Sequence, residues 1–187
     1  MAFNVPEALF RETAFYHFDI FEGADVARRD PLVDRMLAHW HGIRPGSGLP
    51  TRQDLRPQAI PRLLPHLVIM DLVSGPGLNG EPFGLHVRLI GSHVTAHFGE
   101  LTDRRIERME NRDAARRIYH MADRVIASRD AALSVVRGIA PGREGLMAAA
   151  LYLPFSGVDG KVDKVVTMVH VHEASSPIGR APGDFTL

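Results

Sequence analysis

Residues 66–102 read HLVIMDLVSGPGLNGEPFGLHVRLIGSHVTAHFGELT, and the order of the elements in this stretch sets the architecture. Two apolar runs, 66–73 and 83–90, are separated by a linker rich in Gly and Pro, which is the pattern of two strands joined by a hairpin. The second run alternates apolar and polar side chains, as a half-buried strand does. A short helix over 92–98 follows, and Gly99 closes it.

The rest of the chain predicts one clear helix before this stretch, and one helix and three strands after it. Asp30 and Pro31 supply the N-cap and the first position of a helix that carries Trp40. Residues 112–128 form a second helix with one apolar face. The last third contains three strands joined by Gly-rich hairpins, over residues 131–140, 146–155 and 164–173. Hairpin-joined strands pair antiparallel, so the sequence predicts an α+β fold with a five-stranded antiparallel sheet.

The N-terminal region is rich in aromatic side chains and must pack on something. Residues 4–20 begin with a plausible N-cap and an early Pro, so we expect a helix there. Such a helix would dock on the domain or on a second copy of the chain. The candidate residues for contacts between two copies are Phe10, Phe15, Leu37 and Trp40.

The last two strands are apolar on both sides, so something should cover each face of the sheet. We expect the short central helices on one face and the N-terminal helices, or a partner chain, on the other. This divides the chain into an N-terminal helical extension (1–48), a core domain (49–173) and a flexible tail (174–187).

Composition excludes several classes of function. The chain has 187 residues, of which 45% are hydrophobic, and its 22 Lys and Arg balance its 22 Asp and Glu. No excess positive charge draws it to nucleic acid, and the segment 100–130 interleaves Arg with carboxylates. It has no Cys, so disulfides, thiolate zinc sites and a flavin–cysteinyl adduct are excluded. No apolar run is long enough to span a membrane and no signal pattern is visible, so we expect a cytoplasmic protein.

The motifs around the first hairpin resemble a bacterial PAS subgroup of small stand-alone proteins. In that subgroup a helix ending in Trp precedes a Pro-x-Arg and an Asp-containing turn, and Arg-Leu-x-Gly-Thr and Phe-Gly-x-x-Leu-Thr-Gly segments follow. The counterparts in this chain are Trp40, Pro50, Arg52, Asp54, Pro57, Arg88, Leu89, Gly91, Ser92, Phe98, Gly99, Leu101 and Thr102. The likeness covers roughly residues 32–172, with the run 151–155 matching the fourth strand. Ser92 replaces the usual Thr, and Asp103 stands where a Gly is common.

The resemblance implies a sensory or protein-interaction module without an output domain of its own. Such a module would hold a small ligand or a partner protein in a pocket between the sheet and its helices. It would act as a homodimer or on a signalling partner protein. The pocket candidates are Arg88, His93, His97, Tyr119, Met147, Leu151 and Met168.

Several histidines and one arginine invite specific interpretations. His93 and His97 are spaced i, i+4, but the Glu of a metallopeptidase is missing between them, so we predict a pocket-lining role and no metal site. Arg88 needs a carboxylate partner, either Asp54 or Asp71, or else it holds an anionic ligand. His120 lies opposite the apolar face of its helix and should face solvent, which argues against haem.

Two further histidines, His170 and His172, alternate with valines and must share one face of the last strand.

The alternative to a sensor is a small cavity-containing α+β enzyme with His93 or His97 as general base and Arg88 as anion holder. We favour the sensor because of the resemblance, since a fold alone does not determine function.

Overall fold

The computed structural model describes residues 14–140 and 143–173. Its strands are β1 (Ala14–Glu22), β2 (Leu67–Ser74), β3 (Phe83–Ile90), β4 (Ala132–Ala140), β5 (Arg143–Ser156) and β6 (Val162–Glu173). The α-helices are α2 (Pro31–Ile43), α3 (Ser92–Phe98) and α4 (Arg112–Ser128). The short 3-10 helices are η1 (Gly23–Val26), η2 (Pro57–Ala59), η3 (Leu64–His66), η4 (Leu78–Gly80) and η5 (Ile106–Arg108).

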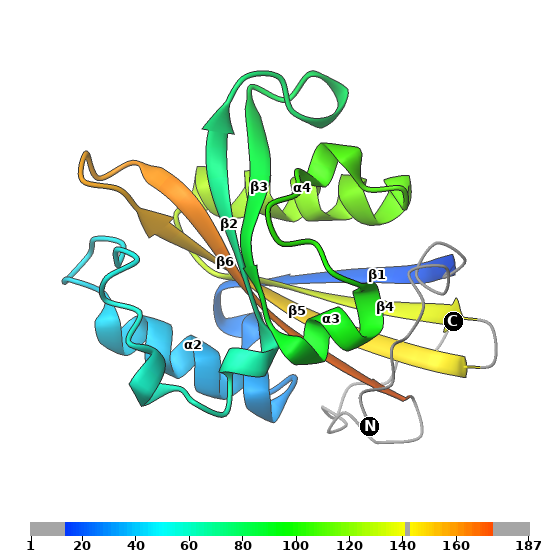
Figure 1. Ribbon diagram of the computed structural model, residues 1–187. Helices are drawn as coiled ribbons and strands as arrows, with labels where there is room; N and C mark the ends of the chain where they lie inside the picture. The colour runs from blue at the N-terminus through cyan, green and yellow to red at the C-terminus, as the bar shows by residue number, and fades with distance from the viewer. Residues whose placement is uncertain (1–13, 141–142, 174–187) are drawn as a thin grey trace.

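All six strands form one antiparallel sheet in the order β1-β4-β5-β6-β2-β3 (Figure 1). The first hairpin and the C-terminal meander meet where β2 pairs with β6, with Leu67 opposite Met168 and Asp71 opposite Lys164. The predicted antiparallel α+β fold is therefore confirmed, and its five expected strands lie in a single layer.

The sixth strand, β1, corrects the expected N-terminal helix. Residues 14–20 are extended and pair with β4, with Phe18 opposite Val136 and Ile20 opposite Ser134. Aromatic and β-branched side chains favour this conformation, and the free edge of β4 supplies the hydrogen-bonding partner. Residues 4–13 of the predicted helix lie outside the described part of the chain, as does the tail 174–187.

Helices cover both faces of the sheet, and two separate apolar clusters result. Side chains of α3, η5 and α4 pack on one face, together with Val68, Leu85 and Val165 of the sheet. On the opposite face α2 packs against residues such as Leu151 and Met168. Figure 1 shows α2 and α4 on opposite sides of the sheet. The expectation that the N-terminal helix carrying Trp40 covers one face is confirmed.

The start of α2 forms as the sequence predicts. Asp30 is its N-cap, and Oδ1 accepts the backbone N–H of Leu32 at 2.7 Å and of Val33 at 3.1 Å. Trp40 is fully buried and donates its indole N–H to the carbonyl of Pro154 on β5 at 3.3 Å. Its predicted contact with a second copy is therefore wrong, because the side chain is already buried within its own domain.

The glycine that follows β3 is required by a close approach of two backbones. A Cβ on Gly91 would lie 2.3 Å from the carbonyl oxygen of Pro65, a distance that no side chain tolerates. The Gly91 N–H also donates to the carbonyl of Leu67 at 2.7 Å. This contact places α3 directly beside the start of β2, and it gives a steric reason for Gly at this position of the motif.

Candidate functional site

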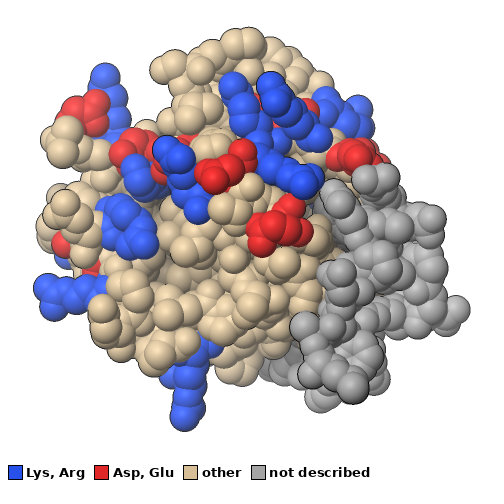
Figure 2. Space-filling model, in the orientation of Figure 1, with Lys and Arg blue, Asp and Glu red and all other residues tan. Residues whose placement is uncertain are grey.

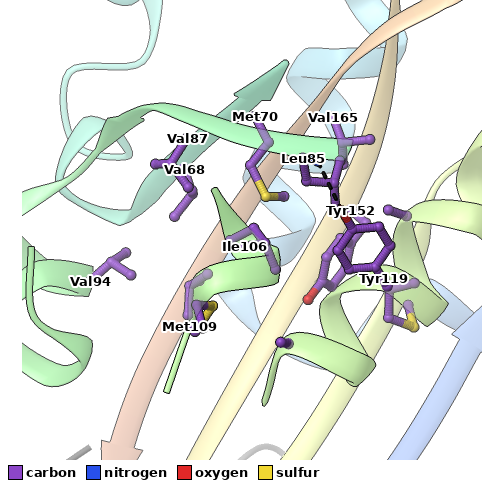
Figure 3. Packing of buried hydrophobic residues seen from close by; sticks show 14 of the residues in the cluster. Val68, Met70, Leu85, Val87, Val94, Ile106, Met109, Tyr119, Tyr152 and Val165 are labelled. Carbon is purple, nitrogen blue, oxygen red and sulfur yellow. Dashed lines mark hydrogen bonds between the residues drawn. The ribbon is translucent and has the colours of Figure 1, made fainter. Parts of the chain in front are cut away.

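An apolar cavity of about 120 Å³ lies between the sheet and the helices on the α4 side. Its floor includes Val68 and Met70 of β2, Val87 of β3 and Val169 of β6. Its roof is built from α3, η5 and α4, and includes Val94, Phe98, Ile106, Met109 and Ile118. Figure 3 shows Val94, Ile106 and Met109 on the helical side, across from Val68, Val87 and Met70 on the strands.

Three hydroxyl groups lie on the floor of this cavity, one on each of three neighbouring strands. They belong to Ser134 of β4, Tyr152 of β5 and Thr167 of β6, and each of the three residues is at most 5% exposed. Tyr152 is hydrogen-bonded to the Ser134 side chain, and burial raises the pKa of Tyr152. The Oγ1 atom of Thr167 is buried and has no hydrogen-bond partner in the part of the chain that the structure describes.

Strand β1 supplies part of the rim. Phe18 lines the cavity together with Arg117 of α4, whose guanidinium carbon lies 5.8 Å from the centre of the Phe18 ring. The rim therefore combines an aromatic ring with a positive charge, while the interior is apolar apart from the hydroxyl groups. Sequence reasoning missed Phe18 because it assigned this segment to a helix outside the sheet.

Tyr119 was expected in the pocket, but it belongs to a structural network beside it. Its hydroxyl accepts the backbone N–H of Leu85 at 3.0 Å (Figure 3) and is also hydrogen-bonded to Glu107. Glu107 in turn accepts a hydrogen bond from Arg105 at 2.8 Å. Burial alone would raise the pKa of Glu107, but the hydrogen bonds from Arg105 and Tyr119 outweigh it and lower that pKa. Tyr119 itself has a raised pKa because of burial and the adjacent carboxylate.

The structure places Met147, Leu151 and Met168 on the other face. Leu151 and Met168 belong to the cluster under α2, and Met147 lies four residues before Leu151 on the same strand, which places it on the same face. Successive residues of a strand point to opposite faces, so the cavity takes the side chains of the intervening positions, such as Ala148 and Ala150. The alternation was visible in the sequence, but nothing in it showed which face carries the cavity.

His93 and His97 also lie outside the cavity lining, so these two pocket candidates need correction. The Nε2 atom of His93 accepts the backbone N–H of Val171 at 3.2 Å. Burial and the neighbouring histidines His66, His97 and His170 lower the pKa of His93 to about 4. With its lone pair engaged and so low a pKa, His93 is unsuited to accept protons near neutral pH. Because neither His93 nor His97 lines the cavity, the geometry does not support the enzymatic alternative that uses them.

His66 and His93 hydrogen-bond to the edge of β6 next to the first residue of β2. His66 donates from Nδ1 to the carbonyl of Val169 at 3.0 Å, one residue beyond the last β2–β6 pair. Because a carbonyl only accepts, this contact assigns the Nδ1–H tautomer to His66. The two imidazoles thus make the hydrogen bonds to this part of β6 that a neighbouring strand would otherwise make.

Arg88 pairs with Asp71, one of the two partners expected from the sequence. The Nε–Oδ2 distance is 2.6 Å, and the Arg88 side chain is 57% exposed. Lys164 also lies 3.6 Å from Asp71. Arg88 therefore belongs to an ion-paired outer surface, away from the cavity lining, and a role as holder of an anion in the cavity is wrong.

The remaining predictions concern surfaces. His120 is exposed on α4, as its helical position predicted. Arg116 pairs with Asp113 and Arg124 pairs with Glu22, each at 2.8 Å, so the Arg-rich segment carries pairs of opposite charge. Figure 2 shows acidic and basic side chains intermixed on the visible face.

For the remaining dimer candidates, Leu37 is half-buried on α2, whereas Phe10 and the side chain of Phe15 lie outside the described part. No helix among residues 14–140 and 143–173 is long and apolar enough to cross a membrane.

An antiparallel sheet with short helices folded over a small cavity, preceded by a helix that covers the outer face, is the architecture of a sensor-type α+β domain. Comparison with known families agrees with it. A family model described as PAS domain matches residues 28–170, and the chain belongs to this family. No curated protein and no solved structure matches the chain.

Proposed function

We propose that this protein is a sensory or interaction module whose signal is a small, mainly apolar molecule bound in the cavity between the sheet and α4. The buried Thr167 hydroxyl carries this proposal. A buried hydroxyl without a hydrogen-bond partner costs free energy, and a polar atom of a ligand would remove that cost. The surrounding walls are apolar, as in most small-molecule sites.

The size of the cavity limits the ligand. At about 120 Å³ it is slightly smaller than the roughly 150 Å³ apolar cavity that holds one benzene molecule. The ligand, or the part of it that enters, is therefore a single ring or a short alkyl group. Because the floor offers hydroxyls, the fitting group carries one hydroxyl or carbonyl close to its apolar part.

The roof of the cavity connects ligand binding to a response. Three short elements, α3, η5 and the start of α4, form it, and a ligand that binds only the closed state stabilises their packing. A change in these surface elements is the kind of change that another protein can read. We propose that the module signals in this way, by contact with a partner protein.

We also propose that two copies associate through the N-terminal region. Among the described strands, β1 is terminal in the sheet and pairs on one side only, with β4. An edge strand offers unpaired backbone groups, and a second copy can cover them. Leu37, Phe10 and Phe15 remain the candidate contact residues.

The ligand proposal is tested by thermal-shift and NMR titrations with benzyl alcohol, phenol and indole as probes. We expect saturable stabilisation of the wild-type chain and chemical shift changes at cavity residues. Thr167→Val keeps the shape and removes the hydroxyl, so affinity for the hydroxyl-bearing probes should fall about 5- to 10-fold. Thr167→Ser is the matched control and should bind as the wild type does.

Filling the cavity gives an independent check. Ala150→Leu places a larger side chain in the lining and should abolish binding of all three probes. Equal binding by this variant and the wild type would show that the probes bind elsewhere, and the proposal would then be wrong. Native mass spectrometry of the purified protein would in addition identify a retained small molecule.

A further inference from the structure

A cluster of metal-binding side chains lies on the α2 face, away from the cavity. Asp30, His170 and His172 each offer one ligand atom, and these atoms all lie within 4.8 Å of one another. Within the ranges 14–140 and 143–173 they form the one group of at least three such side chains. They join two elements that are distant in sequence, the N-cap of α2 and the end of β6.

The side chain of His172 is the feature that demands a ligand. Both of its ring nitrogens are buried, and neither has a hydrogen-bond partner among the described residues. A neutral imidazole carries one N–H donor and one lone pair, and burying both without partners is costly. A metal ion bound to the lone pair would remove the larger part of this cost, because a metal–nitrogen bond is much stronger than a hydrogen bond.

The carboxylate of Asp30 is held in one orientation by its hydrogen bonds. Its Oδ1 atom accepts the N–H groups of Leu32 and Val33, and its Oδ2 atom contacts Nδ1 of His170 at 2.6 Å. Asp30 is 4% exposed, so these contacts are shielded from water. Hydrogen bonds that orient a ligand in this way are typical of metal sites. The N-terminus of a helix carries a partial positive charge that disfavours a cation. The full negative charge of Asp30 outweighs this partial charge.

We propose that Asp30, His170 and His172 bind one divalent transition-metal ion, with Zn²⁺ as the representative case. Two imidazoles and a carboxylate are the donors that Zn²⁺, Ni²⁺ and Cu²⁺ accept, whereas Mg²⁺ and Ca²⁺ take oxygen ligands. Around a tetrahedral Zn²⁺ the donor atoms lie about 3.4 Å apart. The donor atoms, which lie within 4.8 Å of one another, would move closer as the ion binds; the close Asp30–His170 contact would open, and the proton shared between the two side chains would be released to solvent.

The neighbouring histidines leave the fourth position of this site to water or to an outside ligand. The ring of His66 lies 5.6 Å from that of His170, and the ring of His93 lies 6.0 Å from it. Both engage the backbone of β6 through one ring nitrogen. The bound ion would tie the start of α2 to β6 and so stabilise the helix that covers this face.

The proposal is tested on the untagged full-length chain after treatment with a chelator. Zn²⁺ titrated by calorimetry should bind saturably with one ion per chain, and Co²⁺ should give the visible absorption of a low-coordinate site with nitrogen ligands. Asp30→Asn keeps an effective N-cap and removes the charge, and His172→Gln removes one ligand. Each variant should weaken binding at least about 10-fold. His120→Gln, which changes an exposed histidine on α4, is the matched control and should bind as the wild type does.

Circular dichroism and thermal melts establish that each variant is folded, and the cap-preserving Asp30→Asn variant keeps the test valid should His172→Gln unfold. The absence of saturable Zn²⁺ binding by the wild type would overturn the proposal. Unchanged affinity in both Asp30→Asn and His172→Gln would do so as well, because other histidines would then hold the ion. Neither outcome bears on the ligand cavity, which lies on the opposite face of the sheet.

Discussion

At the residue scale, the side chains that matter most are the polar ones that the fold buries. Thr167 is buried, Glu107 and His172 are half-buried, and each is a site where substitution has a defined chemical consequence. Glu107 is fully engaged, whereas Thr167 and His172 have unpartnered atoms in the described part. This difference separates a residue that supports the fold from the two residues at which we propose that ligands bind.

Glu107 predicts a pH-dependent contribution to stability. Its pKa in the folded state is lowered from the ordinary value of 4.5, so the unfolded chain binds the proton more readily. The contribution is therefore present above about pH 4.5 and is lost as the pH falls through the folded pKa. Glu107→Gln should lower the free energy of unfolding by about 1–3 kcal/mol at pH 7, because hydrogen bonds to a charged group are lost.

Denaturant unfolding between pH 3 and pH 7.5 measures this effect. The difference between the wild type and Glu107→Gln should shrink as the solution is acidified. Asp123→Asn, which changes an exposed carboxylate on α4, is the control and should alter stability little at any pH. A difference that stays constant from pH 7.5 to pH 3 would contradict the assigned shift.

At the element scale, each α-helix packs on one face of the sheet, and the two faces differ in what the helices cover. The helices α3 and α4 enclose the cavity, whereas α2 seals the opposite face around Trp40. The sheet separates the two clusters. A substitution in the cluster under α2 should therefore change the free energy of unfolding without directly changing the cavity.

Trp40→Phe tests this separation. The substitution removes part of a fully buried ring and the hydrogen bond to the Pro154 carbonyl. We expect a loss of about 2–4 kcal/mol in the free energy of unfolding. Probe affinity at the cavity, measured well below the melting temperature, should stay within about twofold of the wild type. His41→Gln, on the exposed side of the same helix, is the control, and a large drop in probe affinity for Trp40→Phe would show that the faces are coupled.

At the scale of the whole molecule, one continuous sheet carries both candidate sites, and among the described strands β1 is a terminal one that pairs only with β4. If a second copy pairs with β1, as we propose, the protein is a dimer in solution. Light scattering coupled to size exclusion should give twice the mass of one chain. Phe10→Ser removes an apolar side chain from the proposed contact, so it should raise the dissociation constant of the dimer about tenfold. A monomer at all accessible concentrations would contradict the dimer, while leaving the ligand site untested by this measurement and the fold unaffected.

Local signals were sufficient for the elements whose chemistry is local. Asp30 followed by Pro31 marks the start of α2, the Gly-rich turns separate the strands, and the helical period places His120 toward solvent. The family motif from Trp40 to Thr102 added the order of the strands. A carboxylate partner for Arg88 was also expected, because a charge on a strand needs a partner of opposite sign, and Asp71 was one of the two candidates beside Asp54.

Other features depend on neighbours that are far away in the chain. The segment 14–20 carries aromatic side chains compatible with either a helix or a strand, and the edge of β4 selected the strand. The sequence prediction placed three residues of the other face in the cavity: Met147, Leu151 and Met168. Alternation shows that a strand has two faces, but it does not show which face lines a cavity. Phe18 and Thr167 could not be recognised, since neither stands in a motif and both owe their place to packing.

The amino-acid sequence by itself determined the family, the three α-helices after residue 30 and the antiparallel pairing of five of the six strands, because caps, turns and alternation act over a few residues. Only the tertiary structure decided which face encloses a cavity, that a sixth strand closes onto β4, and that Asp30 meets His170 and His172. Those facts depend on contacts between segments separated by up to 140 residues, and such contacts exist only after the sheet has assembled.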